Sequence, residues 1–104
     1  MKKYKLLIHE RVFDQISDIQ EYVASVGTYI AAVNYSNRLF DEIESITYLA
    51  DAISYTQWQV AKRYHPKAKR LITHNKKWNI IFHTDGNYVL VDLTRRVFEC
   101  NFAA

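Results

Sequence analysis

The sequence predicts an α+β protein in which a helical hairpin packs on one face of an antiparallel sheet, in the element order β-α-α-β-β-β. Apolar residues recur at three- and four-residue steps between residues 11 and 53, which is the period of an amphipathic helix. Between residues 70 and 94 they alternate with polar residues, as in a strand with one buried face. Each surface has an apolar side that needs a partner, so we expect the helices to cover the sheet.

The N-terminal half predicts one strand and two helices. Tyr4 to Ile8 is rich in β-forming residues and indicates the first strand. A first helix from Arg11 is expected to end at Gly27, and Thr28 can cap a second helix of about 24 residues, roughly 36 Å long. So short a connection folds the helices back as an antiparallel hairpin. The first helix is expected to place Phe13, Ile16, Ile19 (or Gln20) and Val23 on its apolar side.

The C-terminal half predicts three strands. Residues 54–69 show no clear period, and their aromatic residues indicate an ordered loop. Strands follow at residues 70–74, 78–84 and 88–94, and Asp85-Gly86-Asn87 indicates a hairpin turn because these residues tolerate left-handed backbone conformations. One side of the sheet is expected to carry the core residues Trp78, Ile80, Phe82, Val89, Val91 and Leu93. The opposite side is expected to be an open face with Asn79, Ile81, His83, Arg70 and Arg95.

Length and composition indicate a single globular domain over residues 1–104, in a chain with two Gly and one Pro. The apolar runs are far shorter than the roughly 20 residues that a membrane span needs. A lone cysteine, Cys100, cannot form an internal disulfide, so we expect a cytoplasmic location. The sequence contains no phosphate-binding glycine loop and no histidine pair at helical metal-ligand spacing, so neither a cofactor nor a metal is expected.

Charge divides the chain into an acidic and a basic part. Residues 10–52 hold eight acidic residues against two arginines, whereas residues 53–84 hold seven Lys and Arg residues and no acidic residue. This asymmetry favours a polyanion or an acidic protein as partner for the basic half, although a solvated basic rim has the same pattern. The residues expected at that binding surface are Lys69, Arg70, Lys76, Lys77, Arg95 and Arg96.

His83 is the residue most suited to acid–base chemistry, because it lies on a predicted strand among basic neighbours and histidine exchanges protons near neutral pH. With Arg70 and Arg95 to stabilise a developing phosphorane, it would be the catalytic residue of a ribonuclease. The alternative is an exposed strand histidine with no chemical role. Trp78 could stack a base, but its alternation with Ile80 and Phe82 favours a core position.

Residues 69–96, KRLITHNKKWNIIFHTDGNYVLVDLTRR, resemble the C-terminal half of the RelE/ParE superfamily of toxins. In that family a strand opening with Arg leads to an aromatic-x-Ile-x-Phe/Tyr strand, a short turn and a strand of valines and isoleucines ending in basic residues. The order β-α-α-β-β-β in about a hundred residues is also similar to that family. The resemblance spans nearly the whole chain and rests on pattern rather than on an exact motif.

The resemblance implies the toxin of a type II toxin–antitoxin pair, with a cognate antitoxin protein as partner. Members of the family either cleave mRNA on the ribosome or inhibit DNA gyrase. Nuclease members generally carry an Arg where this chain has Asn79, and a Tyr near the end of the last strand where it has Phe98. Both departures, with the long helical hairpin, favour the ParE branch.

Three functions therefore compete. The first is a toxin that inhibits growth by binding an essential target such as DNA gyrase. The second is an enzyme that cleaves mRNA on the ribosome with His83, Arg70 and Arg95. The third is a non-toxic relic or interaction module that only binds an acidic partner. Whether the chain is an enzyme stays undecided at this level.

Overall fold

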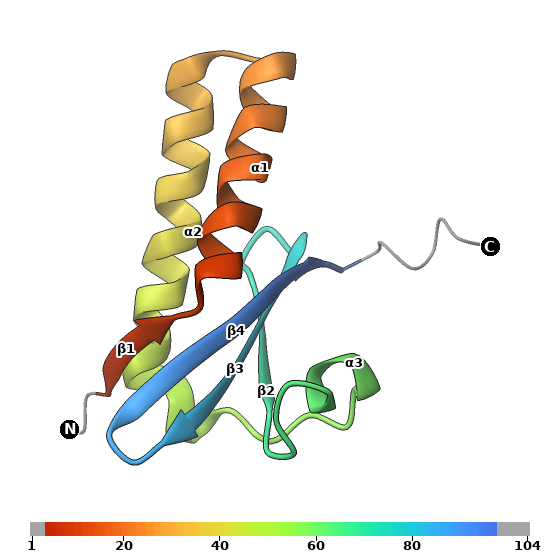
Figure 1. Ribbon diagram of the computed structural model, residues 1–104. Coiled ribbons are helices and arrows are strands. Elements are labelled where there is room, and N and C mark those ends of the chain that lie inside the picture. Colours follow the sequence, from red (N-terminus) through yellow and green to blue (C-terminus); the bar gives the residue numbers. More distant parts are fainter. Residues whose placement is uncertain (1–3, 98–104) are drawn as a thin grey trace.

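Two long helices stand side by side above a twisted four-stranded sheet (Figure 1). This computed structural model describes residues 4–97 of the chain. The elements in chain order are β1 (Lys5–Ile8), α1 (Glu10–Val26), α2 (Tyr29–Leu49), the 3-10 helix η1 (Ala50–Ala52), α3 (Gln59–Lys62), β2 (Lys69–Ile72), β3 (Trp78–Asp85) and β4 (Tyr88–Arg96). The predicted α+β class and element order are confirmed, with two short helical turns added between α2 and β2.

The sheet has the strand order β1-β4-β3-β2 and is mixed rather than antiparallel. The pairs β2–β3 and β3–β4 are antiparallel, as tight turns require. The strand β1, however, runs parallel to β4, with Lys5 opposite Tyr88 and Ile8 opposite Val91. The expectation of a purely antiparallel sheet is wrong at this pair. No hairpin joins β1 to its neighbour, so the local turn chemistry does not set its direction.

Side-chain caps set the ends of the helical hairpin. His9 begins α1 by accepting the backbone N–H of Arg11 at Nδ1 (3.1 Å), and Thr28 begins α2 by accepting the N–H of Ala31 at Oγ1 (3.1 Å). Gly27 follows the last residue of α1, as predicted. No helix within residues 4–97 combines the length and apolar character needed to cross a membrane.

The main core lies between the helical hairpin and the sheet. Its buried residues are Tyr4, Val12, Ile16, Leu39, Ile43, Ile46, Ala50, Ile80, Phe82, Val89 and Val91. Phe13, which we expected in the core, is 49% exposed and packs against Phe40 of α2 with a ring-centroid distance of 5.8 Å. Val12 and Ile16, one turn apart on α1, are buried against the sheet, so the buried stripe begins one residue earlier than predicted.

A β-bulge in β4 changes which side chains face the helices. Ile81 pairs with Leu93 and Phe82 pairs with Val91, so Asp92 is an extra residue without a partner on β3. The alternation of β4 therefore shifts by one residue beyond Asp92. Leu93, which we expected in the main core, lies on the opposite face with Ile81.

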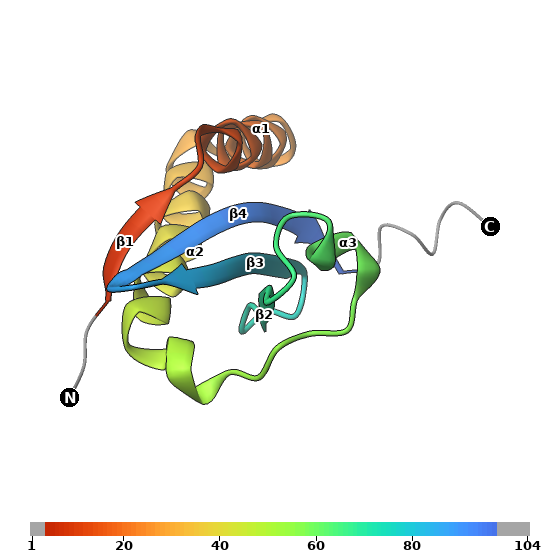
Figure 2. The same ribbon diagram turned by 60° about the horizontal axis from the view of Figure 1, so that its bottom comes forward.

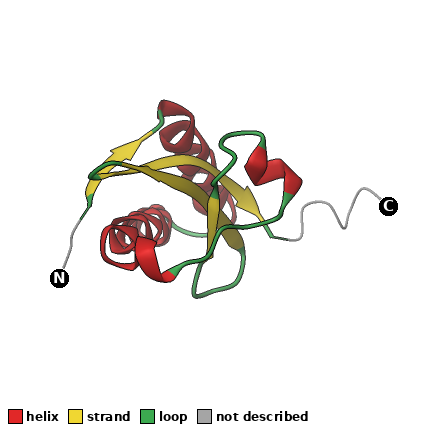
Figure 3. Cartoon of the chain, turned by 90° about the horizontal axis from the view of Figure 1, so that it is seen from below, coloured by secondary structure: helices red, strands yellow, loops and turns green. Residues whose placement is uncertain are grey.

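That opposite face is covered rather than open. Residues 54–68, here called the covering segment, run from the foot of α2 around the sheet and include α3 (Figure 2). Figure 3 shows the strands lying between the long helical pair and α3. Ala61 and Ala68 of this segment are buried with Ile81 and Leu93, and Trp58 and Val60 pack against them. The prediction of an ordered loop holds, but the prediction that this sheet face is open is wrong, because its apolar residues need a cover.

The burial pattern of α1 predicts a contrast between two substitutions. Replacing Ile16, which is 2% exposed, with Ala should lower the free energy of unfolding by about 3 kcal/mol through lost burial and a cavity. Phe13→Ala should cost about 1 kcal/mol, because it removes mainly the contact with Phe40. Urea unfolding followed by circular dichroism measures both values. Equal losses would contradict the orientation of α1.

Tyr4 predicts a stability that depends on alkaline pH. Its hydroxyl donates to Asp51 Oδ1 at 2.5 Å, and this hydrogen bond, followed by burial, raises the pKa of Tyr4 above its ordinary value of 10.0. The stabilisation is therefore complete below about pH 10 and is lost as the pH rises through the higher folded-state pKa. Tyr4→Phe should cost about 1 kcal/mol at pH 7, and the difference from the wild type should shrink above pH 10 in urea titrations. A difference that grows with pH would show that the sign is wrong.

Candidate partner-binding groove

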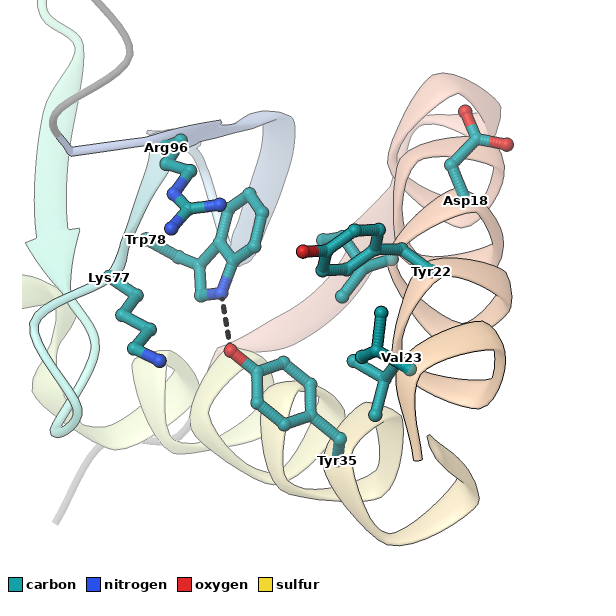
Figure 4. Close-up of a pocket in the computed structure, with 9 residues that line it drawn as sticks. Asp18, Tyr22, Val23, Tyr35, Lys77, Trp78 and Arg96 are labelled. Carbon is teal, nitrogen blue, oxygen red and sulfur yellow. Dashed lines mark hydrogen bonds between the residues drawn. The ribbon is translucent and has the colours of Figure 1, made fainter. Parts of the chain in front are cut away.

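A groove of about 460 Å³ lies where the helical hairpin meets the ends of β3 and β4 (Figure 4). The helical wall comes from α1, and α2 adds one tyrosine. The other wall comes from the turn before β3, the first residue of β3 and the last residue of β4. The residues that line it are Asp18, Ile19, Tyr22, Val23, Val26, Tyr35, Lys77, Trp78 and Arg96.

Trp78 forms a fixed wall of the groove. Its indole Nε1 donates to the hydroxyl of Tyr35 at 2.9 Å, as the dashed line in Figure 4 marks. Asn75 Nδ2 also donates to that hydroxyl at 3.3 Å. The guanidinium carbon of Arg96 lies 5.8 Å from the Trp78 ring centroid, within cation–π range. Trp78 packs against the core, as its alternation predicted, and also forms part of the site.

The α1 wall exposes apolar side chains. Tyr22 is 63% exposed and Val26 is 68% exposed, one turn apart on the same helix face. Tyr29 and Ile30, at the start of α2, are also exposed. Such clustering is typical of surfaces that bind other molecules.

Two cations stand at the sheet side of the groove. Lys77 follows a turn in which Lys76 has a left-handed backbone (φ 61°). Glu42 of α2 holds that turn, since its Oε1 accepts the backbone N–H of His74 at 2.8 Å and lies 2.9 Å from the His74 ring nitrogen Nδ1. Arg96 reaches the groove because the bulge turns it to the helical face, where it pairs with Trp78. Asp18 provides the opposite charge on α1.

A second, more polar pocket adjoins the groove, sharing Trp78 and Arg96 with it. Its other lining residues are Gln15, Tyr64, Leu93, Thr94 and Arg95. The Arg11 guanidinium carbon lies 4.9 Å from the ring centroid of Tyr64, so a third arginine stands nearby. The site as a whole combines an apolar end beside the helices with a basic end beside the sheet.

The predicted basic residues do not form one surface. Lys69 is buried, with Nζ donating to the carbonyl oxygen of Ala50 at 2.6 Å, so it does not belong to an exposed binding surface. Lys69 pairs with Phe82, so its side chain lies on the core face of the sheet. The prediction of an exposed Lys69 failed because the sequence alone does not give this register. Arg70 lies on the opposite face, with its guanidinium 5.4 Å from the Trp58 ring centroid. Lys77 and Arg96 share the groove, Arg95 lines the polar pocket, and Lys76 stays exposed on the turn.

His83 is not on an open face. Its side chain is 13% exposed, its Nδ1 lies 2.6 Å from Oδ2 of Asp92, and the ring of His65 stacks on it at 4.1 Å. Arg95 pairs with Asn79, four residues along β3 from His83, which is about 13 Å at 3.3 Å per residue.

Asn79 is 2% exposed, and its Oδ1 has no hydrogen-bond partner among the residues that the structure describes. It is buried within the sheet and offers no surface to a ligand. Phe98, the second departure from the nuclease pattern, lies outside the described residues. Sequence reasoning missed Tyr22 and Tyr35 as site residues. The sequence did contain a signal for Tyr22. It lies beside the buried stripe of α1 in the helical pattern, so its large aromatic side chain is left outside the core.

Comparison with solved structures confirms a ParE-like fold. A chain of the structure described as "Chromosomal ParDE TA system from P. aeruginosa" superposes with a TM-score of 0.77, covering 91% of this chain and 97% of that chain at 12% sequence identity. No protein-family model matches the sequence, and no curated protein matches it either. At this identity the likeness is one of fold, and it agrees with the architecture that residues 69–96 implied.

The Tyr35–Trp78 hydrogen bond predicts how rigid the groove is. Tyr35→Phe removes the acceptor of the Trp78 indole N–H and should lower the free energy of unfolding by about 1 kcal/mol. In a Trp58→Phe background, where Trp78 is the single tryptophan, the emission of Trp78 should also shift. Tyr29→Phe, at an exposed tyrosine at the start of α2, is the matched control. Unchanged emission after Tyr35→Phe would show that the bond does not hold the indole in solution.

Proposed function

We propose that this chain is the toxin component of a type II toxin–antitoxin system, held inactive by a cognate antitoxin and inhibiting growth by binding an essential cytoplasmic target such as DNA gyrase. One observation carries the proposal: the fold matches nearly the whole length of a chain from a ParDE toxin–antitoxin system. The resemblance of residues 69–96 to the toxin superfamily points to the same class. The toxin identity and the target are both inferences from this likeness.

The arrangement of the predicted catalytic residues supports binding over RNA cleavage. A general base must come within hydrogen-bond reach of the hydroxyl it activates, and a cation must reach the same phosphate. Here His65 covers His83, and Asp92 engages its Nδ1. The backbone positions of His83 and Arg95 are about 13 Å apart along the strand, so one phosphate would have to be reached by both side chains in extended conformations. The groove, in contrast, offers exposed apolar and cationic side chains, which suit the binding of another molecule.

Expression of the chain alone in a bacterial host should therefore arrest growth and induce a DNA-damage response, without cutting mRNA. His83→Ala should retain the arrest, because under this proposal His83 has no catalytic role. Growth curves, a DNA-damage reporter and mapping of mRNA 5′ ends measure these effects separately. Co-expression of a neighbouring small gene that encodes an antitoxin should restore growth.

Two results would replace this proposal. Codon-positioned mRNA cuts that disappear in His83→Ala would make the chain a ribosome-dependent nuclease. No growth effect at any expression level would make it a non-toxic interaction module. A stable, folded chain must be verified by circular dichroism in each case.

A further inference from the structure

We propose that the far end of the α1–α2 hairpin is a self-association surface, through which two copies of this chain pack as a symmetric dimer. The surface comprises residues 22–37, here called the hairpin end, which include the end of α1, the Gly27-Thr28 connection and the start of α2. The hairpin end projects away from the sheet (Figure 1). Self-association of the free chain does not depend on the function proposed above.

The hairpin end carries no charge. Residues 22–37 contain no Asp, Glu, Lys, Arg or His in sixteen consecutive positions, although charged residues make up 24% of the chain. Charged residues resume at Glu21 on one side and at Arg38 on the other. Depletion of charge together with exposed tyrosines is the composition found at the centre of protein–protein interfaces.

Small residues fill the contact between the two helices here, and large apolar residues lie outside it. Ala32 is fully buried, and Ser36 is 4% exposed, with its hydroxyl donating to Gln20 Oε1 at 2.9 Å. Tyr29 and Ile30 of the same helix are 71% and 73% exposed. The hairpin is therefore packed internally, and its large apolar side chains are left for contact with another molecule.

The exposed apolar residues lie within a short distance of one another. Val26 and Ile30 are four residues apart across the Gly27-Thr28 connection, which limits their separation to about 14 Å. Tyr22 lies one helical turn before Val26, about 6 Å along the axis of α1. One partner surface can therefore reach all of them.

The charge distribution favours a second copy over a membrane or a charged protein. Surfaces that bind anionic lipids carry Lys and Arg beside their apolar residues, whereas the nearest charged residues on α1 are Asp18 and Glu21. A charged protein surface would lose its hydration against side chains that offer no ion pair. A second hairpin end is uncharged and apolar, so two copies related by a two-fold axis meet without facing charges.

The area of the hairpin end sets the expected strength of the dimer. Tyr22 and Tyr29, each more than half exposed, offer roughly 250 Å² per copy, since a whole tyrosine buries about 200 Å². Val26, Ile30 and their small exposed neighbours bring the interface to roughly 1,000 Å² over both copies. This area lies at the lower limit of specific interfaces, so we expect a reversible dimer with a Kd on the order of 100 µM.

Dilution of the full chain tests self-association directly. Sedimentation equilibrium between about 10 µM and about 1 mM should show an average mass that rises from monomer towards dimer. In nuclear magnetic resonance spectra over the same range, the amide signals that shift should belong to residues 22–37. A monomer at every concentration, or shifts confined to the sheet, would overturn the inference.

The variant Ala31→Glu separates self-association from folding. Ala31 is exposed, and its backbone N–H donates to the Thr28 cap of α2. A glutamate there completes a capping box with Thr28 and stabilises the helix start, while its carboxylate should weaken the apolar dimer at least about tenfold. The matched control Gln59→Glu, with the same charge change at the exposed first residue of α3, should stay within about twofold. Undiminished association in Ala31→Glu would contradict the inference.

An uncharged substitution and a lipid control complete the test. Ile30→Ser should weaken the dimer at least about tenfold, because each dimer loses two buried isoleucines. Circular dichroism verifies that both hairpin-end variants are folded. The chain should not float with vesicles of phosphatidylcholine and phosphatidylserine, and flotation that Ile30→Ser abolishes would assign the hairpin end to a membrane instead.

Discussion

The extra residue in β4 controls how the C-terminal half of this protein is built. Asp92 has no partner on β3, so every side chain after it changes face relative to the simple alternation. Leu93 turns away from the helices and joins the second apolar cluster, which holds the covering segment. Thr94 turns towards α1, where Gln15 engages it, and Arg96 turns towards Trp78. Without the bulge, the groove would lose its arginine and the covering segment would lose an anchor.

The two faces of the sheet consequently have different roles. One face carries the helical hairpin and the main core, and the groove opens at its end. The other face is protected by residues 54–68, which bring Trp58 beside Arg70 and His65 onto His83. The His83 ring is therefore enclosed, while apolar and cationic side chains stay accessible on the helical side. This distribution fits a protein whose action depends on what it binds.

The groove depends on contacts between segments distant in sequence. Tyr35 of α2 binds Trp78, and Glu42 of the same helix holds the turn that precedes Lys77. These two contacts join the end of the sheet to the helical hairpin. The hairpin extends past them, so Tyr22 and Val26 stay exposed although their helix is well packed at its base. The same length that stabilises the pair of helices thus creates its accessible apolar surface.

Local patterns in the sequence determined the element order, the helix boundaries at Gly27 and Thr28, and the hairpin at Gly86, because caps, turns and periodicity act over a few residues. Tertiary structure alone decided the parallel direction of β1, the burial of Lys69, the cover over His83 and the exposure of Phe13. Each of these depends on which distant segment supplies the neighbour. Tertiary structure also decided the sheet face on which Leu93 and Arg96 lie. The sequence of β4 alternates without interruption, but the bulge at Asp92 shifts that alternation by one residue. The same division applies to the groove. Its cations could be predicted from the sequence, but their position beside Tyr22, Tyr35 and Trp78 depends on the tertiary fold.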